Sequence, residues 1–134
     1  MNALDTNILV YAMDRTDDPR HAIAAGMMAQ AVAESWLLPV QVMAELMNVA
    51  SRKRSDLRHL AVTALASLQI ACTLVETLPN DILTAFALAN HHQLQYFDAL
   101  IITAAARAGA TTLYSEDMQN GLTIGPLTVR NPFI

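Results

Sequence analysis

Four acidic residues in this chain of 134 residues are hard to explain as ordinary surface charge: Asp5, Glu45, Asp98 and Asp117. Carboxylates that meet in one cleft repel one another, so a positive charge has to compensate them. The chain offers no matching set of basic residues. Hard cations such as Mg²⁺ or Mn²⁺ prefer oxygen ligands, and beside a bound phosphate they activate water and stabilise a leaving oxygen. The implied chemistry is hydrolysis of a phosphodiester.

Glu45 is the most informative of these acids because of its place on an expected helix over Val40–Arg52. It lies three residues after Val42 and four before Val49, so it points along an apolar stripe. A carboxylate that faces an apolar layer costs several kcal/mol unless it is paired or bound to a metal. An ion pair with Arg52 is the alternative, although Arg52 is seven residues away at the helix end.

Two of the other acids follow short apolar runs that we expect to be strands. Asp5 comes directly after the first run, and Asp117 comes shortly after a run that ends at Tyr114. Parallel strands place such residues at one carboxyl edge of the sheet, where sites form. Glu116 adjoins Asp117, and we expect only Asp117 to face the site. Asp98 heads an expected helix from Ala99, where a helix N-cap is the alternative role.

The net charge argues against a strongly basic nucleic-acid-binding surface. It is −4, with an isoelectric point near 5.4, whereas phosphate contacts normally require basic side chains. Half of the eight basic residues lie in one stretch: Arg52, Lys53, Arg54 and Arg58. We take these four as candidate contacts to a nucleic-acid backbone. A solvated helix end is an equally good interpretation.

Several other chemistries lack their motifs. With four glycines the chain has no Walker loop and no dinucleotide fingerprint, and there is no Gly-x-Ser-x-Gly elbow. Its histidines show no zinc spacing. The single cysteine, Cys72, excludes an internal disulfide and suits a reducing cytoplasm. No signal peptide is expected at the N-terminus, and no apolar run is long enough for a membrane helix.

The elements that must position these residues alternate along the chain. Short apolar runs predict strands, and longer amphipathic stretches predict helices. Such alternation indicates a parallel sheet covered on both faces. The sequence therefore predicts one α/β domain over residues 1–134, a three-layer α/β/α fold with a central parallel sheet of about five strands. The expected strands are 2–4, 35–39, 72–75, 111–114 and 124–129, and the expected helices are 8–12, 20–33, 40–52, 55–68, 79–91 and 99–108.

The order of these segments resembles a known family. Leu4–Tyr11 resembles the opening of a PIN domain, especially that of the VapC-like toxins of prokaryotic toxin–antitoxin pairs. Val42–Val49, Tyr96–Ala105 and Leu113–Gln119 resemble the segments that carry the family's second, third and fourth acids, and Asn131–Phe133 resembles the usual ending. Each motif alone is weak evidence for the resemblance, whereas four motifs in the right order and at the right spacing are strong evidence together.

The resemblance implies a metal-dependent ribonuclease. In it, Asp5 and Asp98 would be the first ligands of Mg²⁺ or Mn²⁺, and Glu45 and Asp117 would complete the set directly or through water. Small polar residues would support the acids: Thr6, Asn7 and Ser115. The family also implies an RNA target, a homodimer and a cognate antitoxin as partner.

Two alternatives remain open at the level of sequence. One is a PIN nuclease of RNA maturation, which the absence of a neighbouring antitoxin gene would indicate. The other is an RNA-binding or interaction module that keeps the cleft without turnover, which an activity assay would separate. The methionine pairs Met27–Met28 and Met43–Met47 could serve a dimer interface, but methionines at helical spacing more often belong to a core.

Overall fold

Short strands and longer helices alternate through all 134 residues of the computed structural model. The helices are α1 (Thr6–Met13), α2 (Pro19–Glu34), α3 (Val40–Arg52), the 3₁₀ turn η1 (Ser55–Leu57), α4 (Arg58–Ala71), α5 (Pro79–His92) and α6 (Tyr96–Arg107). The strands are β1 (Asn2–Leu4), β2 (Leu37–Pro39), β3 (Thr73–Val75), β4 (Thr112–Tyr114), β5 (Thr123–Ile124) and β6 (Leu127–Arg130).

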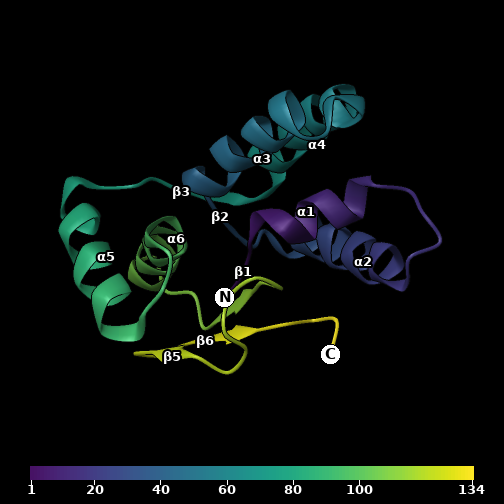
Figure 1. The fold of residues 1–134 in the computed structure, drawn as a ribbon. Helices are drawn as coiled ribbons and strands as arrows, with labels where there is room; N and C mark the ends of the chain where they lie inside the picture. Colours follow the sequence, from purple (N-terminus) through teal and green to yellow (C-terminus); the bar gives the residue numbers. More distant parts are fainter.

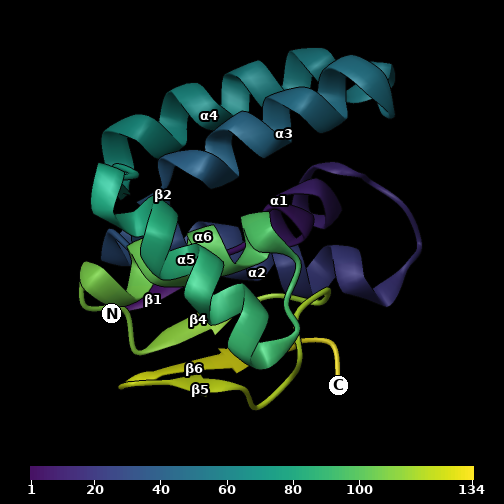
Figure 2. The same ribbon diagram turned by 60° about the vertical axis from the view of Figure 1, so that its left-hand side comes forward.

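The strands form one six-stranded sheet in the order β3-β2-β1-β4-β6-β5. All neighbouring pairs are parallel except β5 and β6, which are antiparallel. The α1–α2 and α5–α6 pairs lie on opposite sides of the sheet in Figure 1, and α3 continues directly from the carboxyl end of β2. Figures 1 and 2 both show α3 and α4 side by side. The expected three-layer α/β/α fold is confirmed.

The last part of the sheet differs from the expectation. A single strand over 124–129 was predicted, and this prediction is wrong because Gly125 and Pro126 turn the chain between β5 and β6. Gly125 adopts a φ of 56°, in the left-handed region that glycine enters without strain. The hairpin adds a sixth, antiparallel strand at the sheet edge (Figure 2).

The core explains why the sheet and its helices hold a fixed geometry at the site. The central residues of β1 and β4, Ala3 and Leu113, are fully buried. In α6, seven consecutive residues from Ala99 to Ala105 are buried, so this helix contacts neighbours on every side. Burying one Leu or Ile side chain contributes roughly 1.5–3 kcal/mol, and close-packed interiors deform little. No helix is long and apolar enough to cross a membrane.

Candidate active site

A cleft of about 830 Å³ opens at the carboxyl edge of the sheet. Its lining comes from the end of β1, from α1 and α3, from the first turn of α6, and from the loop after β4. Six acidic residues line it: Asp5, Asp14, Glu45, Asp98, Glu116 and Asp117. The four acids singled out from the sequence therefore meet in one cleft, although up to 112 positions separate them along the chain.

Ion pairing divides these six acids into two groups. Asp14 accepts from Arg54 at 2.8 Å, and Glu116 accepts from Arg20 at 2.9 Å. None of the other four, Asp5, Glu45, Asp98 and Asp117, forms a salt bridge with a basic side chain. The structure leaves negative charge uncompensated at these four positions.

Asp5 is anchored most firmly. The register that pairs Leu4 with Tyr114 places Asp5 and Ser115 next to each other just beyond the strands. One carboxylate oxygen of Asp5 accepts from the Thr6 amide at 2.7 Å, and the other accepts from the Ser115 hydroxyl at 2.7 Å. Burial raises the pKa of Asp5 to about 6; the two hydrogen bonds oppose this, and the nearby charges of other acids add to it.

Asp98 lies in the first turn of α6 and is not its N-cap. The helix begins at Tyr96, and the cap is Gln95, whose side-chain oxygen accepts from the Asp98 amide at 3.3 Å. The N-cap interpretation of Asp98 is therefore wrong, because α6 starts earlier than expected. Burial, followed by the charges of Glu45 and Asp117, raises the pKa of Asp98 to about 6.

Glu45 projects from α3 at the border of its buried stripe. Val42 is fully buried, whereas Glu45 is half-buried and accepts from the Thr6 hydroxyl at 3.1 Å and from the Gln41 amide at 3.2 Å. The alternative of an ion pair with Arg52 is not found. Gln41 was not foreseen as a site residue, although it stands four residues before Glu45 on the same helix face.

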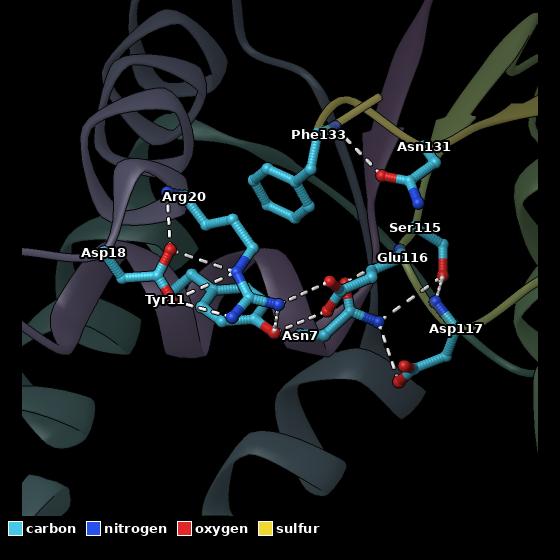
Figure 3. Close-up of polar contacts among 9 residues, drawn as sticks. All are labelled: Asn7, Tyr11, Asp18, Arg20, Ser115, Glu116, Asp117, Asn131 and Phe133. Atoms are coloured by element: carbon cyan, nitrogen blue, oxygen red, sulfur yellow. Dashed lines mark hydrogen bonds and ion pairs between the residues drawn. The ribbon is translucent and has the colours of Figure 1, made fainter.

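Asp117 is exposed and stands on the loop after β4. Its carboxylate accepts from the Asn7 amide at 3.0 Å, and its backbone amide donates to the Ser115 hydroxyl at 3.2 Å. Glu116 also lines the cleft but forms no contact with the other acids. Its carboxylate points instead to Tyr11 and Arg20 (Figure 3).

The three supporting residues link the acids to one another. Thr6 connects Asp5 to Glu45 through its amide and its hydroxyl. The Asn7 amide donates to Asp5 at 3.2 Å as well as to Asp117. Ser115 is fully buried and bridges Asp5 to the amides that follow β4. These contacts set the orientation of three of the four acids.

The structure places only two of the four basic candidates at the cleft. Lys53 and Arg54 line the cleft, whereas Arg52 and Arg58 do not. Arg54 is paired with Asp14 and Asp56, and Arg58 donates to backbone carbonyls at the end of α3. Lys53 is exposed and makes no ion pair.

The carboxylate oxygens of the cleft suit a hard cation, although they do not form a complete coordination site. No three His, Cys, Asp or Glu side chains lie close enough together to hold a metal ion as they stand. Mg²⁺ in proteins usually keeps several waters and takes only one or two carboxylates directly, so spaced acids are compatible with it. The pKa values of Asp5 and Asp98 are raised first by burial, and the charges of neighbouring acids add to this. The residues present thus fit a hydrated divalent ion.

The chain belongs to the PIN domain family, whose model matches residues 3–119. Its fold is similar to solved toxin structures. VapC20 of Mycobacterium tuberculosis, a Sarcin-Ricin loop cleaving toxin, shares 17% identity over 87% of this chain and 90% of its own, with a TM-score of 0.66. VapBC2 from Rickettsia felis, bound to a promoter DNA fragment, shares 18% over 97% of each chain with a TM-score of 0.68. FitAcB from Neisseria gonorrhoeae shares 18% over 99% of each chain with a TM-score of 0.67. No curated protein sequence matches the chain significantly.

Proposed function

We propose that residues 1–134 form one nuclease domain, a divalent-metal-dependent endoribonuclease that acts as the toxin of a toxin–antitoxin pair. The observation that carries the proposal is the cleft of six acids in which only Asp14 and Glu116 have a basic partner. Four carboxylates left without compensation are costly for folding, so their presence points to a function. Membership of the PIN domain family and the fold shared with VapC toxins support a nuclease.

Mg²⁺ or Mn²⁺ would be held by Asp5 and Asp98, with Glu45 and Asp117 completing the set directly or through water. When bound, such an ion binds the phosphate, activates water and stabilises the leaving oxygen. Thr6, Asn7 and Ser115 hold the carboxylates in place by the hydrogen bonds described above. Asp5 is the most firmly fixed of the four, because its two carboxylate oxygens accept hydrogen bonds of 2.7 Å each.

The RNA would enter over the basic end of the cleft. Lys53 lines the cleft without an ion-pair partner, and we propose that it contacts the RNA backbone first. Arg54 is held by Asp14 and Asp56, which orients its guanidinium at the cleft wall. Arg52 and Arg58 lie outside the lining and would contact only RNA that extends beyond it. The negative net charge predicts weak affinity that falls steeply with salt.

A protein partner is part of the proposal. Two of the similar structures are a VapBC2 complex and a toxin–antitoxin complex from Klebsiella pneumoniae, which supports a cognate antitoxin for this chain. We also propose a homodimer, as expected from the family resemblance. An empty cleft with four free carboxylates is an anionic pocket, so the antitoxin would insert an Arg or Lys side chain there.

Cleavage of structured RNA by the purified protein tests the proposal. We expect cutting with millimolar Mn²⁺, none with EDTA, and none by Asp5→Asn. The control is Asp17→Asn, which removes an exposed acid outside the cleft and leaves cleavage unchanged. Expression should arrest growth, and co-expression of the antitoxin should relieve the arrest. If soluble wild-type protein cuts no RNA in Mn²⁺, the proposed nuclease function is wrong. Arrest that persists in Asp5→Asn would indicate the non-catalytic interaction module.

A further inference from the structure

The loop after β4 carries Asp117 but has no regular secondary structure of its own until β5. Loops of this kind are normally the more mobile parts of a fold. A carboxylate that must meet a cation needs a fixed position, because a misplacement of about 1 Å can be costly in a reaction. Something other than a helix or strand therefore has to hold this loop.

Glu116, next to Asp117, is held by two side chains from elsewhere in the fold. Its Oε2 accepts from the Tyr11 hydroxyl at 2.6 Å, and its Oε1 accepts from the Arg20 guanidinium at 2.9 Å. Arg20 also donates to the Tyr11 hydroxyl at 2.9 Å, so the three side chains close a triangle. Tyr11 lies in the last turn of α1, and Arg20 lies in the first turn of α2. Figure 3 shows this triangle on the side of the loop away from Asp117.

The triangle is itself supported on two sides. Asp18, the N-cap of α2, accepts from the Arg20 side chain through Oδ1 at 3.1 Å and through Oδ2 at 2.7 Å, which orients the guanidinium. The Arg20 guanidinium carbon also lies 4.6 Å from the centre of the Tyr11 ring, a cation–π distance. The Phe133 ring packs edge-to-face against the same Tyr11 ring, with 5.2 Å between the ring centroids. Planar and multidentate contacts of this kind define geometry as well as charge.

The backbone carries this fixation from Glu116 to Asp117. The Glu116 amide donates to the side-chain oxygen of Asn7 at 3.2 Å, and the nitrogen of the same Asn7 amide donates to Asp117 at 3.0 Å. The amides of Asp117 and Met118 donate to the Ser115 hydroxyl. The acceptors of these amides are the side chains of Asn7 and Ser115, so a displacement of Glu116 would also disturb the contacts of Asp117 next to it.

We propose that Tyr11, Arg20 and Glu116 form a positioning clamp that holds Asp117 at the cleft for the binding of the divalent ion. This rests on the proposed function, since it assigns a role within that same site. The clamp also keeps Glu116 turned away and neutralised by Arg20, so it does not become a fifth uncompensated carboxylate beside the other four. Neither Arg20 nor Tyr11 forms a salt bridge or hydrogen bond with those four acids, so their effect has to pass through the loop.

Tyr11→Phe is the central variant because it removes one hydroxyl and keeps the ring that packs on Arg20 and Phe133. Arg20→Met is the second variant. The matched control is Arg107→Met, which breaks the ion pair with Asp81 on α5. The Arg20 and Arg107 side chains are similarly exposed, at 40% and 37%, and Arg107 does not line the cleft. Arg107→Met therefore reports what the loss of a structural ion pair does by itself.

Two measurements decide the inference. The first is hydrogen exchange of the amides of residues 116–118 in metal-free protein, which we expect to become faster in Tyr11→Phe and Arg20→Met but not in Arg107→Met. The second is Mn²⁺ affinity by calorimetry well below the melting temperature, which we expect to weaken about tenfold in the two clamp variants, as is typical when a group that orients a metal ligand is lost. Adding Tyr11→Phe to Asp117→Asn should weaken Mn²⁺ binding no further, because both changes act through Asp117.

If hydrogen exchange of the amides of residues 116–118 is unchanged in both clamp variants, the clamp does not hold the loop and the inference is wrong. Faster exchange with wild-type Mn²⁺ affinity would also overturn it, because the triangle would then order the loop without positioning Asp117. If the two substitutions weaken Mn²⁺ affinity additively in the double variant, Tyr11 does not act through Asp117, and the inference is wrong. A wild-type protein that neither binds Mn²⁺ nor cuts RNA would contradict the proposed function, and with it the role of the clamp in ion binding. The exchange measurement would then still decide whether the triangle orders the loop.

Discussion

At the scale of single residues, the pairing of each acid determines what its charge does to stability. Asp98 has no basic partner, and its pKa is raised to about 6 by burial and by the charges of Glu45 and Asp117. Asp14 lines the same cleft but is paired with Arg54, whose guanidinium lowers the pKa of this carboxyl. Neutralising the two acids should therefore change the free energy of unfolding in opposite directions.

We expect Asp98→Asn to stabilise the metal-free protein at pH 7, on the order of 1 kcal/mol after solvent screening, while abolishing RNA cleavage. Asp14→Asn is the matched control and should lower the melting temperature. Thermal melts in EDTA at pH 7, together with cleavage rates in Mn²⁺, check both variants. An Asp98→Asn protein that is less stable than wild type, or that still cuts RNA, would contradict the assignment of Asp98.

At the scale of elements, the start of α6 determines where Asp98 stands. Gln95 caps this helix through its side-chain oxygen, and Asp98 occupies the first turn that the cap closes. Gln95→Ala should destabilise the protein by about 0.5–1 kcal/mol and should lower cleavage, because a frayed first turn displaces Asp98. Gln69→Ala is the control, since Gln69 is exposed on α4 far along the chain from the cleft residues. Urea unfolding and cleavage rates measure the two effects, and equal cleavage by both variants would show that the cap does not position Asp98.

At the scale of the whole molecule, two groups of carboxyls give the metal-free protein a stability maximum. The pKa values of Asp5 and Asp98 are raised to about 6, so the folded state binds protons more readily than the unfolded state. Their ionisation therefore removes stability as pH rises from about 4 to 6. The pKa values of the paired acids are lowered, so their contribution is lost as pH falls below the ordinary value of 3.8: Asp14, Asp18, Asp56 and Asp81.

We therefore expect the free energy of unfolding in EDTA to be highest near pH 4, to decline until about pH 6 and then to level off. Urea unfolding between about pH 3 and pH 8 measures this directly. Millimolar Mn²⁺ at pH 7 should raise the melting temperature, because an ion that binds only the folded state stabilises it by mass action. Stability that climbs steadily from about pH 4 to pH 6 without metal would contradict the raised pKa values of Asp5 and Asp98.

Much of the fold and the acidic set could be predicted from the sequence. Alternating short strands and amphipathic helices are local patterns, carried by neighbouring residues, and they predicted the layered α/β/α fold. The order of the strand ends placed Asp5 and Asp117 at one edge, and helical spacing singled out Glu45. Gly125 and Pro126 mark a turn in the sequence, but the apolar residues on either side of them predict a single strand.

Only the tertiary structure decides which charges are compensated. Arg54 meets Asp14 across 40 positions, and Arg20 meets Glu116 across 96. Such pairs depend on the packing of α1 against α2 and α3 and on the path of the loop after β4, and no local periodicity records them. The sequence by itself therefore predicted four of the six acids that gather at the cleft. Packing between distant segments determined which of those acids remain free for a cation and which side chains hold them there, because a hydrogen bond or ion pair requires contact in space whatever the separation along the chain.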